Sequence, residues 1–272
     1  FQIPQALQGH WQALRNELAP HDWMAIAYSG GVDSTFLVWF ASKVLLKHVL
    51  PVVMVTPLTS RREYLEACET GRRLDLAVEE LKVDVLIYGD VAGNSRNRCY
   101  ACKRAMIIAL RELAESRGYP AVYDGTNVDD LVEHRPGLRA AHELGVLSPL
   151  ARAGFDKAII RESSRLAGLP NWNKPSQACL ATRVPYGCGL TPEMLSRIEH
   201  AEAYLLDLGC SQVRVRVDGQ LARIELLAED FHLVIAPGTR QRLIDCFNEL
   251  GFIQVALDLA GYRSGSGDRV LL

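Results

Sequence analysis

The sequence predicts an α/β protein in which a parallel sheet, covered by helices on both faces, is followed by a smaller α/β unit. Two observations carry this prediction. In residues 1–170, short apolar segments alternate with helical patterns, which is typical of parallel strands joined by helices. Residues 171–190 are then rich in proline and glycine, which predicts a linker loop. Residues 191–272 follow a different pattern and are expected to form a second domain.

The elements of the first domain follow from the spacing of apolar residues. Apolar strands are expected at 23–28, 51–55 and 121–124, with a weaker strand near 82–88. Helices are expected at 5–18, 34–48, 60–77, 100–117 and 154–167. Parallel sheets bind ligands at the carboxyl ends of their strands. The first strand ends at Ser29, so we expect a binding site there.

The second domain is predicted to have the order α-β-β-α-β. Its first strands alternate between apolar and charged residues and are joined by Asp218-Gly219, which strongly favours a hairpin. The predicted elements are a helix at 191–208, strands at 212–217 and 221–226, a helix at 239–250 and a strand at 252–257.

Composition excludes several classes of protein. The chain has 272 residues, of which 49% are apolar and 23% are charged, and its mean hydropathy of +0.02 is that of an ordinary globular protein. A net charge of −2 gives no support for binding nucleic acid. No apolar run approaches the roughly 20 residues of a membrane span. Seven cysteines without an export signal at the start favour the cytoplasm over a disulfide framework.

The segment Ser29-Gly30-Gly31-Val32-Asp33-Ser34 lies between the first strand and the following helix. Its glycines allow a sharp turn that brings backbone N–H groups close to a ligand. The helix start favours a bound anion. The hydroxyls of Ser29 and Ser34 add donors, and Asp33 is placed to hold Mg²⁺ against phosphate oxygens. The segment matches neither the Walker loop nor G-x-G-x-x-G. An incidental Gly-Gly turn with a helix cap is the plainer alternative, which six matching residues disfavour.

Four cysteines are candidates for chemistry. Cys99-Tyr100-Ala101-Cys102 begins a predicted helix, and a C-x-x-C pair serves redox, zinc or iron–sulfur sites. No second C-x-x-C or nearby histidine pair completes a zinc site. Cys179 and Cys188 lie in the irregular loop. Three thiolates on one iron–sulfur cluster would leave one iron open to another ligand, while scattered thiols are the alternative.

The Ser-Gly-Gly-x-Asp-Ser segment resembles the pyrophosphate-binding loop of the PP-loop ATP pyrophosphatases. Those enzymes split ATP between its α and β phosphates. Further segments are similar to motifs of the LarE branch, and together they span nearly the whole chain. They are Asp124-Gly125-Thr126-Asn127, Arg135-Pro136-Gly137, Asn171-Trp172-Asn173-Lys174-Pro175, Thr182-Arg183-Val184-Pro185-Tyr186-Gly187, Val213-Arg214-Val215-Arg216, Ala222-Arg223-Ile224-Glu225 and Leu257-Asp258-Leu259-Ala260-Gly261-Tyr262-Arg263-Ser264-Gly265.

The resemblance implies a Rossmann-like PP-loop domain at 1–170, an active-site loop at 171–190 and a substrate-binding and oligomerisation domain at 191–272. LarE proteins adenylate a carboxylate of pyridinium biscarboxylic acid mononucleotide and replace its oxygen with sulfur, in biosynthesis of the nickel-pincer nucleotide cofactor of lactate racemase. The implied cofactors are ATP and Mg²⁺, and the implied partners are this mononucleotide, a sulfide donor and further copies of the chain. The implied nucleotide-binding residues are Ser29, Gly30, Gly31, Asp33, Ser34, Asp124 and Gly125.

The resemblance also offers two sources of sulfur. One LarE subtype sacrifices a cysteine, and that position falls here on Ala178, next to Cys179. Another subtype uses three cysteines and a [4Fe-4S] cluster that delivers sulfide. Cys99, Cys102 and Cys179 fit the second subtype, with Cys188 as a substitute ligand. Donation of sulfur by Cys179 itself stays open as the rival.

Arginines are the candidates for holding the acceptor substrate. Arg214 and Arg216 alternate on one strand and therefore face the same side, which suits a phosphate or carboxylate. The weaker candidates are Arg183, Lys103, Arg104 and Asp124. Solvated surface charge is the alternative for each. Three functions stay open: sulfur transfer, another PP-loop reaction (tRNA thiolation or ammonia-dependent amide formation), and nucleotide binding without catalysis.

Overall fold

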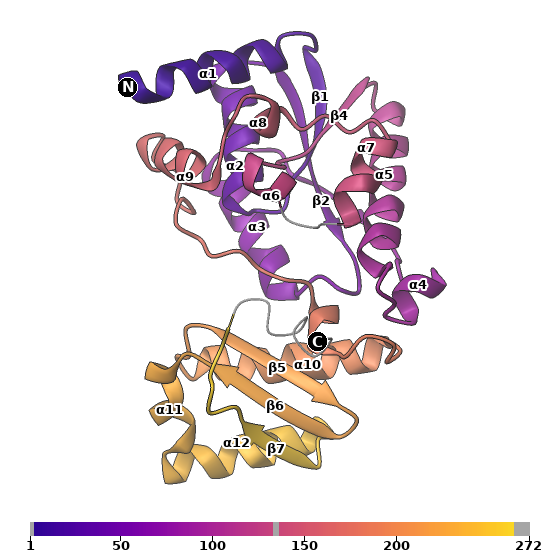
Figure 1. Ribbon diagram of the computed structural model, residues 1–272, viewed down its shortest axis with the longest axis vertical. Coiled ribbons are helices and arrows are strands. Elements are labelled where there is room, and N and C mark those ends of the chain that lie inside the picture. The colour runs from indigo at the N-terminus through magenta and orange to yellow at the C-terminus, as the bar shows by residue number, and fades with distance from the viewer. Residues whose placement is uncertain (1–2, 133–135, 264–272) are drawn as a thin grey trace. The chain divides into compact units, whose positions relative to one another are not determined.

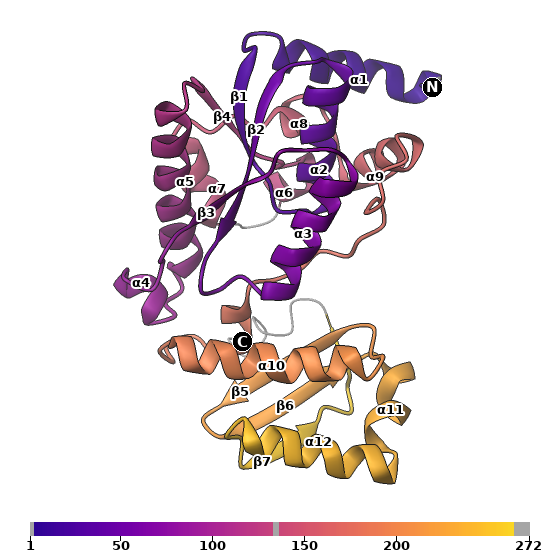
Figure 2. The same cartoon turned by 180° about the vertical axis from the view of Figure 1, so that it is seen from behind.

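The computed structural model describes residues 3–132 and 136–263. The chain divides into two compact units, shown in Figure 1 and from behind in Figure 2. The first comprises Phe1–Tyr88 and Asn97–Gln177, and the second comprises Gly89–Arg96 and Ala178–Leu272. A short segment between two elements of the first unit therefore belongs to the second, a feature that the sequence did not indicate.

The first unit contains a four-stranded, entirely parallel sheet in the order β3-β2-β1-β4. Its strands are β1 (Trp23–Ala27), β2 (His48–Val55), β3 (Glu79–Lys82) and β4 (Ala121–Tyr123). The two central strands are rich in apolar residues because helices cover the sheet on both faces. The predicted α/β class with a parallel sheet is confirmed.

Helices pack on both faces of this sheet (Figures 1 and 2). One face carries α5 (Arg98–Ser116), against which α7 packs. The opposite face carries most of the others. The remaining elements of this unit are α1 (Gln5–Leu18), α2 (Val32–Trp39) with its π-helical continuation η1 (Phe40–Val44), α3 (Arg61–Arg73), α6 (Val128–Val132), α7 (Pro136–Glu143), α8 (Pro149–Arg152) and α9 (Lys157–Leu166).

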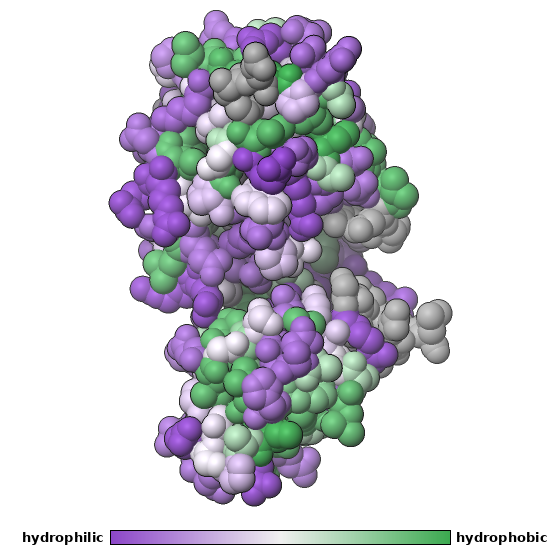
Figure 3. All heavy atoms as spheres, turned by 90° about the vertical axis from the view of Figure 1, so that its left-hand side faces the viewer, coloured by the Kyte–Doolittle hydropathy of each residue, from purple (hydrophilic) through white to green (hydrophobic). Residues whose placement is uncertain are grey.

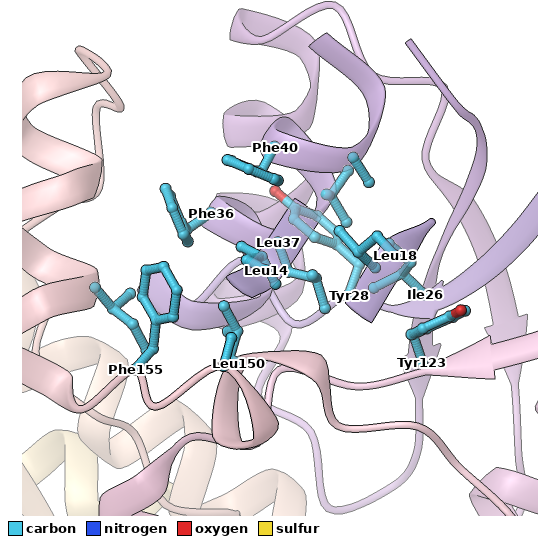
Figure 4. Packing of buried hydrophobic residues seen from close by; sticks show 14 of the residues in the cluster. Leu14, Leu18, Ile26, Tyr28, Phe36, Leu37, Phe40, Tyr123, Leu150 and Phe155 are labelled. Atoms are coloured by element: carbon cyan, nitrogen blue, oxygen red, sulfur yellow. The ribbon is translucent and has the colours of Figure 1, made fainter. Parts of the chain in front are cut away.

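The larger hydrophobic core joins β1 and β4 to α1, α2 and α9 (Figure 4). Phe36 of α2 and Phe40 at the start of η1 are fully buried, and burying each such side chain stabilises the fold by about 1.5–3 kcal/mol. Trp11 of α1 meets both rings edge-on, at 5.8 and 5.1 Å between centroids. This packing fixes α2, and with it the loop that precedes α2, against the sheet.

The second unit contains a three-stranded sheet in the order β5-β6-β7. β5 (Val213–Asp218) and β6 (Leu221–Leu226) form the predicted antiparallel hairpin, and β7 (Gln254–Leu257) runs parallel to β6. Figure 2 shows helices α10 and α12 in front of this sheet. The other elements are α4 (Gly89–Ala92), η2 (Leu180–Arg183), α10 (Pro192–Asp207), η3 (Ala228–Asp230), α11 (Phe231–Ile235) and α12 (Pro237–Glu249).

Alternation along β5 separates an apolar face from a charged one. Val213, Val215 and Val217 are buried with the core residues of the second unit. Arg214 and Arg216 therefore lie on the opposite face, and the cross-strand partners of these two residues on β6 are Glu225 and Arg223. The predicted shared orientation of the two arginines is confirmed.

Two predicted elements differ from the structure. The strand predicted near 82–88 is wrong, because the pairing residues are Glu79–Lys82 and the chain then turns where the Asp84 carboxylate accepts the N–H of Leu86. Only one face of this edge strand is partly buried, so its hydrophobic pattern was weak. The helix predicted at 34–48 ends earlier, because the chain from His48 onward pairs with β1.

The surface carries polar and apolar side chains in mixture. Figure 3 shows hydrophilic residues over much of one side of the first unit and more hydrophobic surface on the second. None of the helices in the described residues is long and apolar enough to cross a membrane.

Candidate functional site

The loop between β1 and α2 is held in a conformation that requires glycine. Gly30 has a φ of +67°, which is the left-handed region. A Cβ atom at Gly30 would lie 2.5 Å from the Cα atom of Ala67 in α3. The backbone of the loop is thus pressed against α3, where no side chain fits.

Hydroxyl groups close the loop from within. The Ser34 hydroxyl accepts the N–H of Ser29 at 3.1 Å, and the two serine hydroxyls lie 3.1 Å apart. The Ser29 hydroxyl also accepts the N–H of Gly31 at 3.3 Å. Gly31 is the residue before α2, and within the described chain no side chain caps this helix. The first-turn N–H groups of α2 thus remain suited to an anion.

The segment after β4 meets the same helix start. A Cβ atom at Gly125 would lie 2.9 Å from the backbone nitrogen of Ser34. Asn127 donates to the Asp33 carboxylate at 3.2 Å. Since β1 and β4 are neighbours in the sheet, their carboxyl ends bring these two predicted motifs together.

Asp124 lies beneath this site as a buried carboxylate. Oδ1 accepts from the Ser148 hydroxyl at 2.8 Å and from the N–H of Thr126 at 3.2 Å. Oδ2 is buried and lies 3.6 Å from the ammonium group of Lys103. Asp124 therefore shapes the loop after β4 and holds Lys103, one of the weaker candidates, beside it.

Lys157 is a site residue that the sequence analysis missed. Its ammonium group lies 2.7 Å from both oxygens of Asp33, and the two side chains are only 31% and 20% exposed. Asp156 caps the start of α9 by accepting from Ile159, and Asp129 accepts the N–H of Lys157. A cation in the first turn opposes the helix dipole. That local conflict is the feature by which the sequence could have indicated a role for Lys157.

The loop is compatible with a metal ion that is shared with a ligand. Mg²⁺ is commonly held by one or two carboxylates together with phosphate oxygens. Asp33 offers one carboxylate beside the start of α2, and Lys157 pairs with it in the structure. Among the described residues no group of three or more His, Cys, Asp or Glu side chains is arranged to hold a metal. A metal at Asp33 would therefore depend on the phosphates of its ligand.

The cysteines form no disulfide, and the candidates belong to different units. Cys99 is exposed and Cys102 half-buried, and three residues apart on α5 they share one side of the helix. Cys179 and Cys188 belong to the second unit. Thiolates are suitable ligands for iron–sulfur clusters, so the residue types are compatible with one.

Arg183 is committed to its own unit. Its guanidinium forms a double hydrogen bond with Glu202, both contacts being 2.8 Å. Its remaining nitrogen donates to the carbonyl groups of Ala178 and Cys179 at 2.5 and 3.0 Å. Arg183 thus organises the chain around Cys179, and this structural use competes with the predicted substrate contact.

Arg216 is likewise neutralised by protein groups. Both of its contacts with Glu225 are 3.2 Å, and its third nitrogen donates to the carbonyl of Thr182. Glu225 is also within 3.4 Å of Arg223. A fully buried carboxylate is therefore shared by two arginines on the charged face of the sheet.

Arg214 differs from both neighbours. It is 5% exposed, it donates a hydrogen bond to the carbonyl of Val213 at 2.6 Å, and no carboxylate of the described residues forms an ion pair with it. Its guanidinium lies over the Tyr262 ring at 5.3 Å. Burial and the charge of Arg183 lower the pKa of Arg214 below its usual value. A buried cation without a directly paired carboxylate is suited to binding an anion.

Comparison with known proteins gives three relatives, although no family model matches. The chain is 40% identical over 265 residues to an uncharacterized protein of Synechocystis sp., covering 97% of this chain and 99% of that protein. It is 35% identical over 246 residues to the pyridinium-3,5-bisthiocarboxylic acid mononucleotide synthase of Lactiplantibacillus plantarum, covering 89% and 87%. It is 33% identical over 239 residues to an uncharacterized protein of Methanocaldococcus jannaschii, covering 88% and 90%.

We expect Gly30→Ala to destabilise the protein, because alanine is strained at this φ and its Cβ would overlap the α3 backbone. The loss in free energy of unfolding should exceed about 1–2 kcal/mol. Gly9→Ala in α1 is the control, since a Cβ there meets nothing within 4 Å and should stabilise the helix by about 0.5–1 kcal/mol. Urea denaturation followed by tryptophan fluorescence measures both. Equal stability of the two variants would contradict this account of the loop.

We expect Arg183→Met to lower the free energy of unfolding strongly and Arg214→Met to change it little, although both side chains are buried. Removing Arg183 leaves Glu202 as a buried charge without its partner and should cost about 3–5 kcal/mol. Removing Arg214 deletes an uncompensated charge, so its unfolding free energy should stay within about 1 kcal/mol of wild type. Denaturation followed by circular dichroism tests this, and equal losses would show that Arg214 is structural.

Proposed function

Because this chain belongs to the LarE family, we propose that it is an ATP-dependent enzyme that converts a carboxylate of pyridinium biscarboxylic acid mononucleotide into a thiocarboxylate. Alignment with a pyridinium-3,5-bisthiocarboxylic acid mononucleotide synthase over 89% of the chain supports the product class. The loop at Ser29–Ser34 supports the use of ATP, and it is the observation that carries the proposal.

In the first step, a carboxylate oxygen of the substrate attacks the α-phosphorus of ATP. The bond to the β-phosphate breaks, and pyrophosphate leaves with the electron pair. The product is an acyl-adenylate, whose AMP is a far better leaving group than an oxide ion. Activation of this kind is what makes replacement of a carboxylate oxygen by sulfur feasible.

The residues around the loop are suited to the charge that develops on pyrophosphate. The N–H groups at the start of α2 point toward an anion, and the ammonium group of Lys157 adds a positive charge beside them. Mg²⁺, when bound with the nucleotide, supplies further charge neutralisation. Asp33 is the residue that would hold it, and the ammonium group of Lys157 would then be available to phosphate oxygens.

In the second unit, Arg214 is the group that we assign to the phosphate of the mononucleotide. It is buried, cationic and unpaired with any carboxylate of the described chain. Its neighbours Arg216 and Arg183 form ion pairs with Glu225 and Glu202. This refines the sequence prediction, in which Arg214 and Arg216 are the main candidates and Arg183 is a weaker one.

In the second step, a sulfur nucleophile attacks the acyl carbon and AMP leaves. The sulfur source is proposed from sequence: Cys99, Cys102 and Cys179 as ligands of a [4Fe-4S] cluster, with Ala178 in place of the sacrificial cysteine. Such a cluster, when bound, supplies an open iron that holds sulfide. These cysteines are thiols of suitable exposure, since Cys99 is exposed and the other two are half-buried.

Asp33→Asn tests the adenylation step. Asparagine keeps the shape but not the charge that holds Mg²⁺, so pyrophosphate release in the presence of the mononucleotide should fall to background. The partly exposed pair with Lys157 is worth no more than about 1 kcal/mol, so thermal stability should change little. Asp75→Asn, at a fully exposed carboxylate, is the control and should leave release unchanged. Retained release in Asp33→Asn would overturn the assigned role.

Iron content and protein mass together test the sulfur source. Anaerobically purified protein should contain about four irons per chain, and sulfide should support multiple turnovers at constant protein mass. A chain about 34 Da lighter after one turnover, from conversion of a cysteine to dehydroalanine, would instead show that Cys179 donates its own sulfur. Cys188→Ala serves as the control, and loss of iron from that variant would place Cys188 among the ligands.

A further inference from the structure

We propose that Asn171 is a positioning residue that orients the pyrophosphate-binding loop, a role that rests on the proposed use of ATP. Asn171 lies 141 residues from Gly30 along the chain, yet its side-chain amide donates to the Gly30 carbonyl at 3.0 Å. The same nitrogen donates to the Thr35 hydroxyl at 3.0 Å. Both N–H bonds of one amide group are thus directed at the two ends of the turn into α2.

The Gly30 carbonyl controls the direction of a neighbouring donor. A trans peptide is planar, so its C=O and N–H groups point in opposite directions. Holding the carbonyl of Gly30 therefore fixes the N–H of Gly31 on the other side, where it lies 3.3 Å from the Ser29 hydroxyl. Gly30 has no side chain to restrict its own rotation, and its φ of +67° is one of several that glycine adopts readily. The hydrogen bond from Asn171, together with the packing of Gly30 against α3, selects one of them.

The side-chain oxygen of Asn171 contributes no hydrogen bond within the described chain, so the NH₂ group is the part of the amide that holds the loop. Its side-chain oxygen is buried and has no hydrogen-bond partner among the described residues, and the residue is 8% exposed. A buried acceptor without a partner is unfavourable. The side chain therefore occupies this place for its two donors, since neither its oxygen nor its volume explains an amide here.

The segment Asn171–Lys174 also contacts α3, through an ion pair of Lys174. Lys174 pairs with Glu66 of α3 at 2.9 Å, and the N–H of Lys174 bonds back to the Asn171 carbonyl at 3.0 Å. Ala67, the next residue of α3, is the one against which Gly30 packs. Its carbonyl also accepts from the buried Tyr28 hydroxyl at 3.1 Å. The segment Asn171–Lys174 thus bonds to Gly30 on one side and to Glu66 of α3 on the other, next to the place where Gly30 packs against α3.

Asn171→Ala should weaken binding of inorganic pyrophosphate with Mg²⁺ about five- to tenfold, because the turn from Gly30 into α2 is no longer held in place. Binding of adenosine, which makes no use of these donors, should stay unchanged. Asn173→Ala is the matched control, since Asn173 is only two residues away and no hydrogen bond to the loop is assigned to its side chain. Calorimetric titration of the full-length variants measures both ligands.

Asn171→Asp provides a second variant of nearly identical shape. It places a carboxylate oxygen against the Gly30 carbonyl, so its affinity for pyrophosphate should fall below that of Asn171→Ala. An aspartate variant equal to wild type would show that the side chain only fills space. Unchanged pyrophosphate affinity in Asn171→Ala, or parallel loss of adenosine binding, would also overturn the proposal. If wild-type protein binds neither ATP nor pyrophosphate, the proposed function fails with it.

Discussion

The close packing of backbone at the start of α2 is the constraint on which the rest of the first unit depends. Gly30 lies against α3, and Gly125 lies against the nitrogen of Ser34, so three separate segments meet with no side chain between them. Such close backbone contacts form only if the helices and strands that carry these segments are fixed in position. The aromatic cluster of Trp11, Phe36 and Phe40 does this by fixing α2 to α1 and to the sheet. The hydrophobic core therefore determines the position of the loop at Ser29–Ser34.

Charges in this protein divide into those that are neutralised and those that are not. Arg183 and Arg216 are satisfied by Glu202 and Glu225, and they stabilise the second unit by their geometry. Arg214 stands beside them buried and without a carboxylate. A buried charge with no directly paired carboxylate costs free energy of folding, and this cost is the basis of the proposal that a ligand anion pairs with Arg214. Lys157 is paired with Asp33 in the structure, and in the proposed function a bound nucleotide with its metal ion would compete for both partners.

The family relationship and the site geometry support one another from independent sides. The similarity to the Lactiplantibacillus plantarum synthase extends over 89% of the chain, which is more than either unit alone contains. The geometry adds what identity cannot express, namely that Arg183 is engaged around the Cys179 segment and that Asn171 supports the loop. The proposed correspondence of Ala178 to the sacrificial cysteine of one LarE subtype concerns only the source of sulfur.

The sequence by itself determined the parallel α/β fold, the hairpin at Asp218-Gly219, the loop at Ser29–Ser34 and the shared face of Arg214 and Arg216. Each depends on residues that are close along the chain, where periodicity and turn chemistry act. Tertiary structure alone decided the partners of these residues. The pairing of Asp33 with Lys157 spans 124 residues, and the bond from Asn171 to Gly30 spans 141. No local pattern encodes such meetings, because they arise only when packing brings distant segments to one edge of the sheet.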